Sequence, residues 1–285
     1  MKKIKIVLLF TLFVFSLAGC GLNSSNDLEK KEKIKIGVVA PLTGEGATYG
    51  ASMKRGFDLA FDGAPNYKLL YQDSKFDGKL AVTILEKYIS VDKINVIYGE
   101  AASGVTLAMV PVSKKYKVIQ FSSIATSDDL QKSSPYFFRN VPRNSIQGKT
   151  AAEFIFKNIK LSEAAILKDN DEYGLNLAKS FADYFKTYGG KIVLDETYNS
   201  GDKDFKTQLT KIKLSGVKAV FIPGNYAESA IILKQAKELG IKVAFIGGDG
   251  SYSPKLLETA GSSAEGFYCT IMGVDERNAF YNDLS

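Results

Sequence analysis

Residues 34–50 read IKIGVVAPLTGEGATYG, an apolar run followed by a loop of small residues and the start of an amphipathic stretch. The first seven are nearly all apolar, which is typical of a strand buried in a parallel sheet. The amphipathic stretch runs from Tyr49 to Ala60 and places Met53, Phe57 and Ala60 on one side at helical spacing. This strand, loop and helix predict the first β–α unit of an α/β fold.

The same alternation continues along the rest of the chain. Further strands are expected at 67–73, 95–98, 117–122, 136–142, 164–168, 192–198, 217–223, 243–247 and 267–272. Helices are expected at 80–91, 105–116, 146–159, 175–188, 205–214 and 229–239. Apolar strands alternating with helices predict doubly wound parallel sheets, and a break near residues 139–144 divides the pattern into two α/β lobes.

Composition excludes several classes of protein. The chain has 285 residues, of which 24% are charged and 45% hydrophobic, so it can bury the cores of two lobes and is not a disordered chain. It contains no His. A Ser-His-Asp triad, a Cys-His pair, a His-based zinc site and a His general base are therefore impossible. We expect a protein without a catalytic residue, a metal or a cofactor.

The positive charge of the chain is spread rather than clustered. The formal net charge is +6, but Lys2, Lys3 and Lys5 lie in a segment that we expect to be removed, which leaves about +3. Runs such as KKEK at 30–33 mix both signs. A solvated mixed surface is the better interpretation, so no nucleic-acid partner is expected.

The N-terminus has the pattern of an export signal. A basic start is followed by an apolar run at 6–15, shorter than the ~20 residues that a membrane helix needs. The letters LAGC at 17–20 resemble a bacterial lipobox. We therefore expect a lipoprotein signal peptide at 1–19, lipidation of Cys20 and a flexible polar tether at 20–33. The alternative is an ordinary signal peptide in which Cys20 is incidental.

Lipidation of Cys20 would leave Cys269 as the one remaining Cys, without a partner for a disulfide. Cys269 lies in the apolar run GFYCTI at 266–271, and this setting predicts a buried, inert thiol rather than a nucleophile.

Small and polar residues follow several predicted strands, at the end of the sheet where open α/β folds bind ligands. They are found at 41–50, 99–104, 122–127 and 247–250. Small residues let a ligand approach the backbone, and free N–H groups at helix starts favour an anion such as a carboxylate. Each loop taken alone could equally be a turn or a helix cap.

A dinucleotide-binding enzyme is a competing interpretation of the first loop. Gly44, Gly46 and Gly50 follow a strand and open a helix, and Asp73 ends the next strand. The third Gly comes one residue too late for the NAD fingerprint, and Glu45 would bring a negative charge close to the pyrophosphate. Export also argues against it, because nicotinamide cofactors are scarce outside the cell.

Motifs along the whole body carry a family resemblance. In chain order they are IGVVAPLTG at 36–44, YG at 49–50 with Gly56, DS at 73–74, IATS at 124–127 with Leu130, FFR at 137–139, YG at 173–174, DF at 204–205, AVF at 219–221, QA at 235–236 with Gly240, and AEG at 264–266. In this order and spacing the chain resembles the substrate-binding proteins of branched-chain amino-acid (leucine/isoleucine/valine) ABC importers, which have the type I periplasmic-binding fold.

The resemblance implies roles for individual residues. Donors from the first lobe would hold the α-carboxylate of an amino acid and part of its ammonium group, an acidic residue would bind the ammonium, and aromatic residues would line the cleft. The positions that match are Ser103, Thr126 and the backbone of Ala125 for the donors, Asp249 for the acid, and Tyr49, Tyr173 and Tyr226 for the aromatic lining. Family members usually have Glu where this chain has Asp249, one methylene shorter.

It also implies an architecture. Lobe I would comprise 34–139 and 270–285, lobe II would comprise 140–269, and hinges would lie near 139–144 and 268–273. Family members are longer, because their chain adds further elements to the first lobe after crossing back to it. We therefore expect this chain to be truncated and its first lobe to be incomplete.

The implied function is that of a receptor without catalytic activity. It would be exported, anchored to the bilayer through Cys20 and monomeric, and would present a small amino acid to an ABC permease and its ATPase. Two alternatives remain open: the same fold binding an amide, urea or a small carboxylate, and an exported sensor or cell-envelope partner with no role in transport.

Overall fold

The computed structural model describes residues 32–273. The predicted signal peptide, Cys20, the tether up to residue 31 and the predicted part of lobe I after Gly273 lie outside the described residues.

The described strands form two five-stranded sheets in which every pairing is parallel. The first sheet has the order β2-β1-β3-β4-β5 and the second β10-β9-β8-β6-β7. Their bounds are β1 (Ile34–Ala40), β2 (Tyr67–Asp73), β3 (Val96–Tyr98), β4 (Ile119–Ser122), β5 (Phe137–Arg139), β6 (Glu163–Asp169), β7 (Lys191–Tyr198), β8 (Ala219–Ile222), β9 (Ala244–Gly247) and β10 (Tyr268–Cys269). The predicted α/β class with two parallel sheets is confirmed.

Helices connect successive strands. The α-helices are α1 (Ala47–Ala60), α2 (Gly78–Ser90), α3 (Ser103–Tyr116), α4 (Asn144–Glu153), α5 (Glu172–Thr187), α6 (Lys206–Ser215), α7 (Tyr226–Glu238) and α8 (Pro254–Ala260). Short turns of other helix types are η1 (Asp128–Leu130), η2 (Phe154–Asn158), η3 (Asp249–Ser251) and η4 (Gly261–Ala264). We call the first sheet with α1–α3 the first lobe, and the second sheet with α4–α8 the second lobe.

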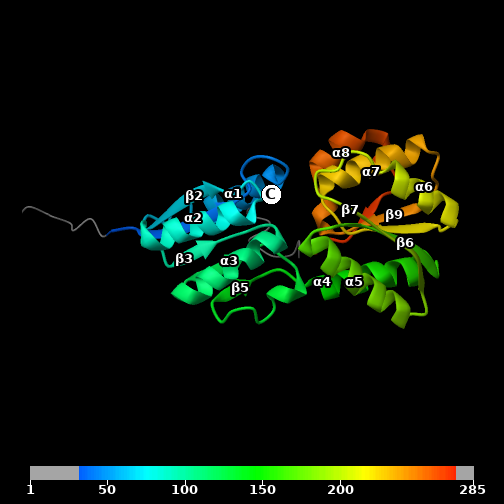
Figure 1. Cartoon of the computed structure of the whole chain (residues 1–285). Helices are drawn as coiled ribbons and strands as arrows, with labels where there is room; N and C mark the ends of the chain where they lie inside the picture. Colours follow the sequence, from blue (N-terminus) through cyan, green and yellow to red (C-terminus); the bar gives the residue numbers. More distant parts are fainter. Residues whose placement is uncertain (1–31, 274–285) are drawn as a thin grey trace, which may run out of the picture. The chain divides into compact units, whose positions relative to one another are not determined.

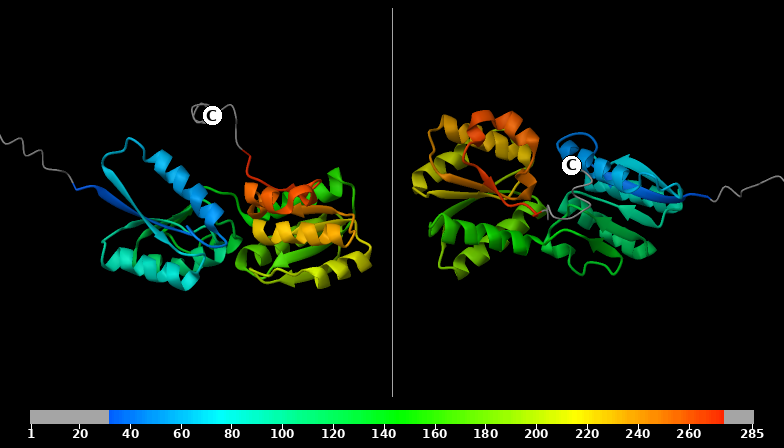
Figure 2. Two further views of the ribbon diagram at one scale, coloured as in Figure 1. Left: turned by 90° about the horizontal axis from the view of Figure 1, so that it is seen from above. Right: turned by 180° about the vertical axis from the view of Figure 1, so that it is seen from behind.

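Alternate residues of each central strand face opposite layers of helix. In β1, Val39 packs with α2 and α3, whereas Val38 packs with Met53 of α1 on the other face (Figure 2). In the second lobe, Val220 of β8 faces α6, α7 and α8, and Phe221 faces α4 and α5 (Figure 1). This period-two alternation within an apolar strand is what a sheet covered on both faces requires.

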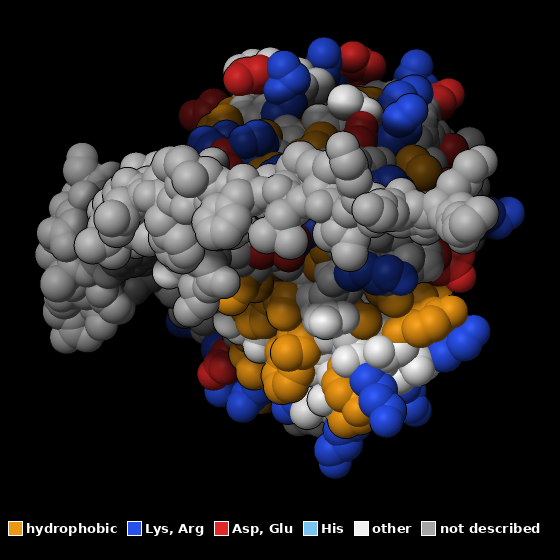
Figure 3. All heavy atoms as spheres, turned by 90° about the vertical axis from the view of Figure 1, so that its left-hand side faces the viewer, with side chains coloured by type: hydrophobic (Ala, Val, Ile, Leu, Met, Phe, Trp, Pro, Cys, Tyr) orange, Lys and Arg blue, Asp and Glu red, His pale blue; other side chains and the backbone are white. Residues whose placement is uncertain are grey.

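The face of the first sheet next to α1 is thinly covered. Among the described residues of α1 only Gly50 and Met53 are buried, and Ala60 is exposed, so the predicted apolar side of this helix is wrong at its C-terminal end. A groove beside α1 is lined by the aromatic rings of Phe57, Phe61, Tyr98 and Phe121. Figure 3 shows hydrophobic side chains gathered in the lower part of the face that it draws, bordered by Lys and Arg.

Several element boundaries differ from the sequence-based expectation; for example, the strand expected at 136–142 ends at Arg139, and α8 was not expected. The strand expected at 117–122 begins at Ile119, because Lys117 has φ +56° and ends α3. The helix expected at 146–159 ends as an α-helix at Glu153 and continues as the π-helical turn η2. The strand expected at 267–272 pairs only at Tyr268 and Cys269.

Cys269 is half-buried rather than buried, contrary to expectation, because its two-residue strand lies at the edge of the second sheet. Desolvation nevertheless raises the pKa of its thiol, which disfavours the reactive thiolate. None of the described helices is both long and apolar enough to span a bilayer.

Candidate ligand-binding site

A cavity of about 210 Å³ lies among loops that follow the carboxyl ends of strands from both sheets. The loops after β2, β3 and β4 of the first lobe contribute to its wall, as do those after β6, β8 and β9 of the second lobe. A cavity of this kind, enclosed by loops and lined by a few polar groups, suits a small ligand. Parallel strands bring their carboxyl ends together, which is why loops distant in sequence meet here.

Most of the predicted site residues line this cavity. They are Tyr49, Ser103, Thr126, Tyr173 and Asp249. Ala125 does not line it, although its neighbours Ile124 and Thr126 do. Tyr226 does not line it either, although its ring contacts that of Tyr49, which does.

The first-lobe side of the cavity presents hydrogen-bond donors. Ser103 is the first residue of α3 and is buried, and its Oγ accepts the backbone N–H of Ser127 at 3.2 Å, which leaves its own hydroxyl hydrogen available. Thr126 is also buried, and its carbonyl oxygen accepts the N–H of Asn144 at 2.9 Å. The N-terminus of α3 adds a partial positive charge, so this side favours an anionic group.

The second-lobe side presents a carboxylate. Asp249 accepts a hydrogen bond of 2.7 Å from the Tyr173 hydroxyl, and its backbone N–H donates to Gln147 Oε1 at 2.9 Å. Desolvation raises the pKa of Asp249. A cation bound beside this carboxylate would favour its ionised form again, so the group is suited to an ammonium ion.

Tyr226 and Tyr49 connect the two lobes. Tyr226 donates from its hydroxyl to the carbonyl oxygen of Glu45 at 2.6 Å and accepts from Thr48 Oγ1 at 3.1 Å. Tyr49 donates to the carbonyl oxygen of Gly250, and its ring meets that of Tyr226 edge-on with centroids 5.3 Å apart. Tyr226 is therefore a contact between the loop before α1 and the start of α7, outside the wall of the cavity.

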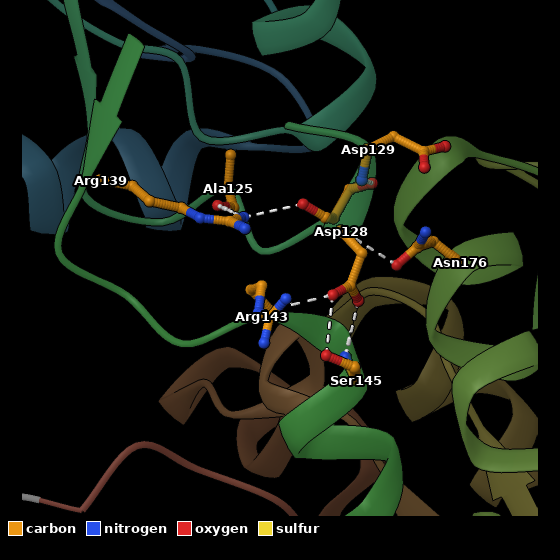
Figure 4. Close-up of polar contacts among 8 residues, drawn as sticks. Ala125, Asp128, Asp129, Arg139, Arg143, Ser145 and Asn176 are labelled. Atoms are coloured by element: carbon orange, nitrogen blue, oxygen red, sulfur yellow. Dashed lines mark hydrogen bonds and ion pairs between the residues drawn. The ribbon is translucent and has the colours of Figure 1, made fainter. Parts of the chain in front are cut away.

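Polar contacts also join the loop after β4 to the chain that enters the second lobe, as Figure 4 shows. Arg139 donates from Nη1 to the carbonyl oxygens of Ala125 at 3.2 Å and Ser127 at 2.8 Å. Asp128 accepts two bonds of 2.7 Å from the backbone N–H and the hydroxyl of Ser145, in the first turn of α4. The loop that carries Thr126 is thus held against the segment at 139–144 where a hinge is expected.

The residues that suggested a dinucleotide fold have other roles. The Asp73 carboxylate accepts the backbone N–H of Leu42 at 2.8 Å and the Thr43 hydroxyl, so it closes the loop after β1. A Cβ at Gly50 would lie 2.1 Å from the carbonyl oxygen of Pro41. Gly50 is therefore explained by close packing of α1 on the loop rather than by a pyrophosphate.

Several lining residues were not predicted individually, although Ala101, Ala102, Ile124 and Gly250 lie in the loops at 99–104, 122–127 and 247–250 that the sequence marked. These lining residues are Ser52, Phe76, Ala101, Ala102, Ile124, Asp171, Asn225, Gly250 and Tyr252. Asp171 lies two residues after the end of β6 and Asn225 three after the end of β8, so the rule that ligands bind at strand carboxyl ends could have identified them. Ser52 and Tyr252 are positioned by tertiary packing, and no local pattern marks them.

The sequence matches the periplasmic binding protein family over residues 33–281. The chain belongs to this family. It is 30% identical over 254 residues to the Leu/Ile/Val-binding protein homolog 1 of Brucella suis, which covers 86% of this chain and 68% of the relative. It is 28% identical over 250 residues to a leucine-, isoleucine-, valine-, threonine- and alanine-binding protein of Pseudomonas aeruginosa, covering 84% of this chain and 66% of that protein.

Solved structures of the same group share the fold of this periplasmic binding protein. A leucine-binding protein from Thermotoga maritima superposes with a TM-score of 0.85 at 27% identity, over 88% of this chain and 74% of the other. A branched-chain amino-acid transporter substrate-binding protein from Streptococcus pneumoniae, solved with isoleucine, has a TM-score of 0.80 at 30% identity, over 87% and 74%. The resemblance to the branched-chain amino-acid binding group and the type I fold is confirmed.

Proposed function

We propose that this periplasmic binding protein binds a branched-chain or related small amino acid between its lobes and presents it, unchanged, to an ABC permease and its ATPase. The observation that carries the proposal is the polarity of the cavity. Ser103 and Thr126 with the N-terminus of α3 form one side, and Asp249 belongs to the opposite lobe. A zwitterion needs donors at one end and an acceptor at the other.

Donors at one end of the cavity and an acceptor at the other, here called the zwitterion clamp, can supply enough free energy to bind an amino acid. A hydrogen bond to a charged group contributes roughly 1.5–3 kcal/mol, and a micromolar dissociation constant needs only about 8 kcal/mol. Three or four such bonds can therefore offset the cost of ordering the ligand. The zwitterion clamp would therefore select amino acids as the class of ligand.

The ligand side chain would meet a mixed, mostly apolar wall. Phe76, Ala101, Ile124 and Tyr252 line the cavity together with the hydroxyl of Ser52. A buried methylene adds only ~0.8 kcal/mol to the binding free energy, so this wall would discriminate only weakly among leucine, isoleucine and valine.

We further infer export and membrane attachment from residues outside the described range. The basic and apolar start of the chain and LAGC at 17–20 support removal of residues 1–19 and lipidation of Cys20. The lobes would be 34–139 with 270–285, and 140–269, and the receptor would act as a monomer. Labelling with a palmitate analogue tests this: a Cys20→Ala variant should lose both label and membrane attachment.

Ligand-dependent thermal melts of the purified chain test the ligand class. A ligand at a hundred times its dissociation constant adds about 2.7 kcal/mol, a shift of about 5–10 °C for a chain of this size. We expect leucine, isoleucine or valine to produce such a shift, with NAD as the control that should not. A cooperative melt that no amino acid shifts would contradict the proposal.

A second candidate keeps the fold and changes the ligand to an amide, urea or a small carboxylate. The observation that favours it is Asp249, which is shorter than Glu and already bonded to the Tyr173 hydroxyl. The same melts discriminate, because a ligand without an ammonium group would then shift the transition and amino acids would not. An exported sensor would bind its ligand equally well but would not support uptake through a permease.

A further inference from the structure

Glu100 is an acidic residue buried directly behind the donor side of the cavity. Its side chain is fully shielded from solvent, and it does not line the cavity. Oε2 accepts the backbone N–H of Ala102 at 2.6 Å, and Oε1 lies 2.6 Å from the Ser74 hydroxyl. The carboxyl group therefore ties the loop after β2 to the residue that immediately precedes Ser103 and α3.

The backbone of Glu100 reaches the third loop of the donor side. Its carbonyl oxygen accepts the Ser122 hydroxyl at 2.7 Å, and the same Ser122 Oγ accepts the backbone N–H of Ala125 at 3.0 Å. Ser103 and the Ala125–Thr126 pair come from different segments, and Glu100 helps to set their relative positions together with the direct bond from the Ser127 N–H to Ser103 Oγ.

We propose that Glu100 positions the donor side of the ligand site and that it takes up a proton when the ligand carboxylate binds. This inference rests on the proposed function. Glu100 itself does not touch the ligand: it acts through Ala102, Ser103 and Ser122.

An ionised Glu100 places a buried negative charge at the N-terminus of α3, the same terminus that the ligand carboxylate would use. Two like charges sharing one site disfavour ionisation of one of them. A neutral Glu100 can donate its proton to Ser74 Oγ while Oε2 still accepts from Ala102, so the loops keep their positions and the repulsion is removed.

Desolvation already raises the pKa of Glu100 to about 7, with a further contribution from the nearby Asp73 carboxylate. Asp77 caps α2 three residues after Ser74, and Glu172 lies beside the first turn of α3, where its Cβ is 3.4 Å from the position of a Cβ on Gly104. No ionisable side chain comes from β4 or from residues 103–112 of α3. A bound carboxylate would raise the pKa of Glu100 again, so ligand affinity should fall as the pH rises through and above 7.

The test is calorimetric titration of the purified chain with L-isoleucine between pH 6 and pH 8.5, in two buffers that differ in ionisation enthalpy. We expect the affinity of the wild type to fall above pH 7 by up to about tenfold per pH unit, with proton uptake on binding. Glu100→Gln stays neutral and can keep the hydrogen bonds, so it should bind at pH 6 like the wild type and lose most of the fall above pH 7.

Ionisation of Asp249 or Asp171, on the side expected to bind the ammonium group, would change ligand affinity in the opposite direction to ionisation of Glu100. A control variant at a buried acid of the same lobe is therefore needed. Asp169→Asn is the matched variant: Asp169 is equally buried, burial raises its pKa to about 7, and it does not line the cavity. This variant should keep the fall in affinity above pH 7.

Each outcome decides between the two proposals. A Glu100→Gln variant with the same pH profile as the wild type contradicts the role of Glu100 and leaves the proposed function intact. If the affinity of the wild type does not fall above pH 7, the role of Glu100 is likewise contradicted and the proposed function is left intact. A folded wild type that binds no amino acid at any pH between 6 and 8.5 contradicts the proposed function, and this inference with it. If Glu100→Gln does not fold, proton uptake by the wild type in the two buffers still tests the proposal.

Discussion

Arg139 Nη1 donates to the carbonyl oxygen of Ala125 at 3.2 Å, which links the last residue of β5 to the loop expected to hold the ligand. The same nitrogen reaches the carbonyl oxygen of Ser127 at 2.8 Å, so Thr126 lies between the two acceptors. Guanidinium groups remain charged in proteins, so this contact does not switch with pH. It joins the donor side of the cavity to the segment through which the chain enters the second lobe.

Substitution of Arg139 should therefore affect binding and stability together. Arg139→Gln loses both bonds and leaves two carbonyl oxygens without this donor, which we expect to cost about 1–3 kcal/mol of folding free energy and to weaken ligand binding roughly tenfold. Urea unfolding and ligand titration of one sample measure both. Arg143→Gln is the control, because Arg143 is exposed and makes a 3.7 Å ion pair with Asp128; equal effects of the two substitutions would contradict the role of Arg139.

Asp249 should contribute to affinity rather than to stability. Asp249→Asn keeps the size of the side chain and can still accept from Tyr173, but it removes the charge that would pair with an ammonium group. We expect amino-acid affinity to fall by about 10- to 100-fold, since a bond to a charged group contributes roughly 1.5–3 kcal/mol. The thermal midpoint without ligand should change little. Asp195→Asn, at an exposed position, is the control; an unchanged affinity in Asp249→Asn would favour the ligand class without an ammonium group.

Tyr226 should affect how long the ligand stays bound. Tyr226→Phe keeps the ring contact with Tyr49 and loses the bond to Glu45 and the acceptor for Thr48. We expect the ligand dissociation rate to rise about two- to tenfold, because a neutral hydrogen bond contributes about 0.5–1.5 kcal/mol. Stopped-flow displacement measures this rate. Tyr252→Phe offers the comparison: Tyr252 lines the cavity and is 66% exposed. A slower association with unchanged dissociation would contradict the role of Tyr226 as a contact between lobes.

Asp169 should make stability depend on pH. Desolvation, with a smaller contribution from Asp171, raises the pKa of Asp169 to about 7, and its Oδ2 finds no partner among the described residues. The unfolded carboxyl titrates at ~3.9, so the folded state binds more protons between about pH 4 and 7, and stability falls as the pH rises through that window. Asp169→Asn should lose less stability between pH 5 and pH 8 than the wild type. Urea midpoints at the two pH values measure it, and Asp195→Asn should retain the wild-type slope.

Two glycines of α1 should respond in opposite directions to substitution by Ala. A Cβ at Gly50 would lie 2.1 Å from the Pro41 carbonyl oxygen, whereas one at Gly56 meets nothing within 4 Å. Gly56→Ala should stabilise by about 0.5–1 kcal/mol through helix propensity, and Gly50→Ala should destabilise by more than that. Thermal melts distinguish the two, and a stabilised Gly50→Ala variant would show that α1 packs differently on the loop.

Local patterns predicted the fold well. Apolar strands such as residues 34–40 and helices at regular intervals indicate parallel α/β sheets, because strand burial on both faces leaves a continuous apolar run. The predicted ends of individual helices and strands were less accurate than the predicted fold class. Lys117 ends α3 in a left-handed conformation that a non-glycine residue adopts only rarely, and the π-turn at η2 has no sequence pattern of its own.

The candidate site was predicted in part, and the reason for the failures is tertiary. Ser103, Thr126 and Asp249 lie in loops whose small residues mark strand ends, so the sequence by itself determined the fold class and the loops that form the donor and acceptor sides. Only the tertiary structure placed Tyr226 in the contact with Glu45 and Thr48, and only it placed the Glu100 carboxyl behind Ser103. Strand order decides which loops become neighbours, and burial decides which charges interact; both depend on residues far apart in the chain, so no local pattern contains them.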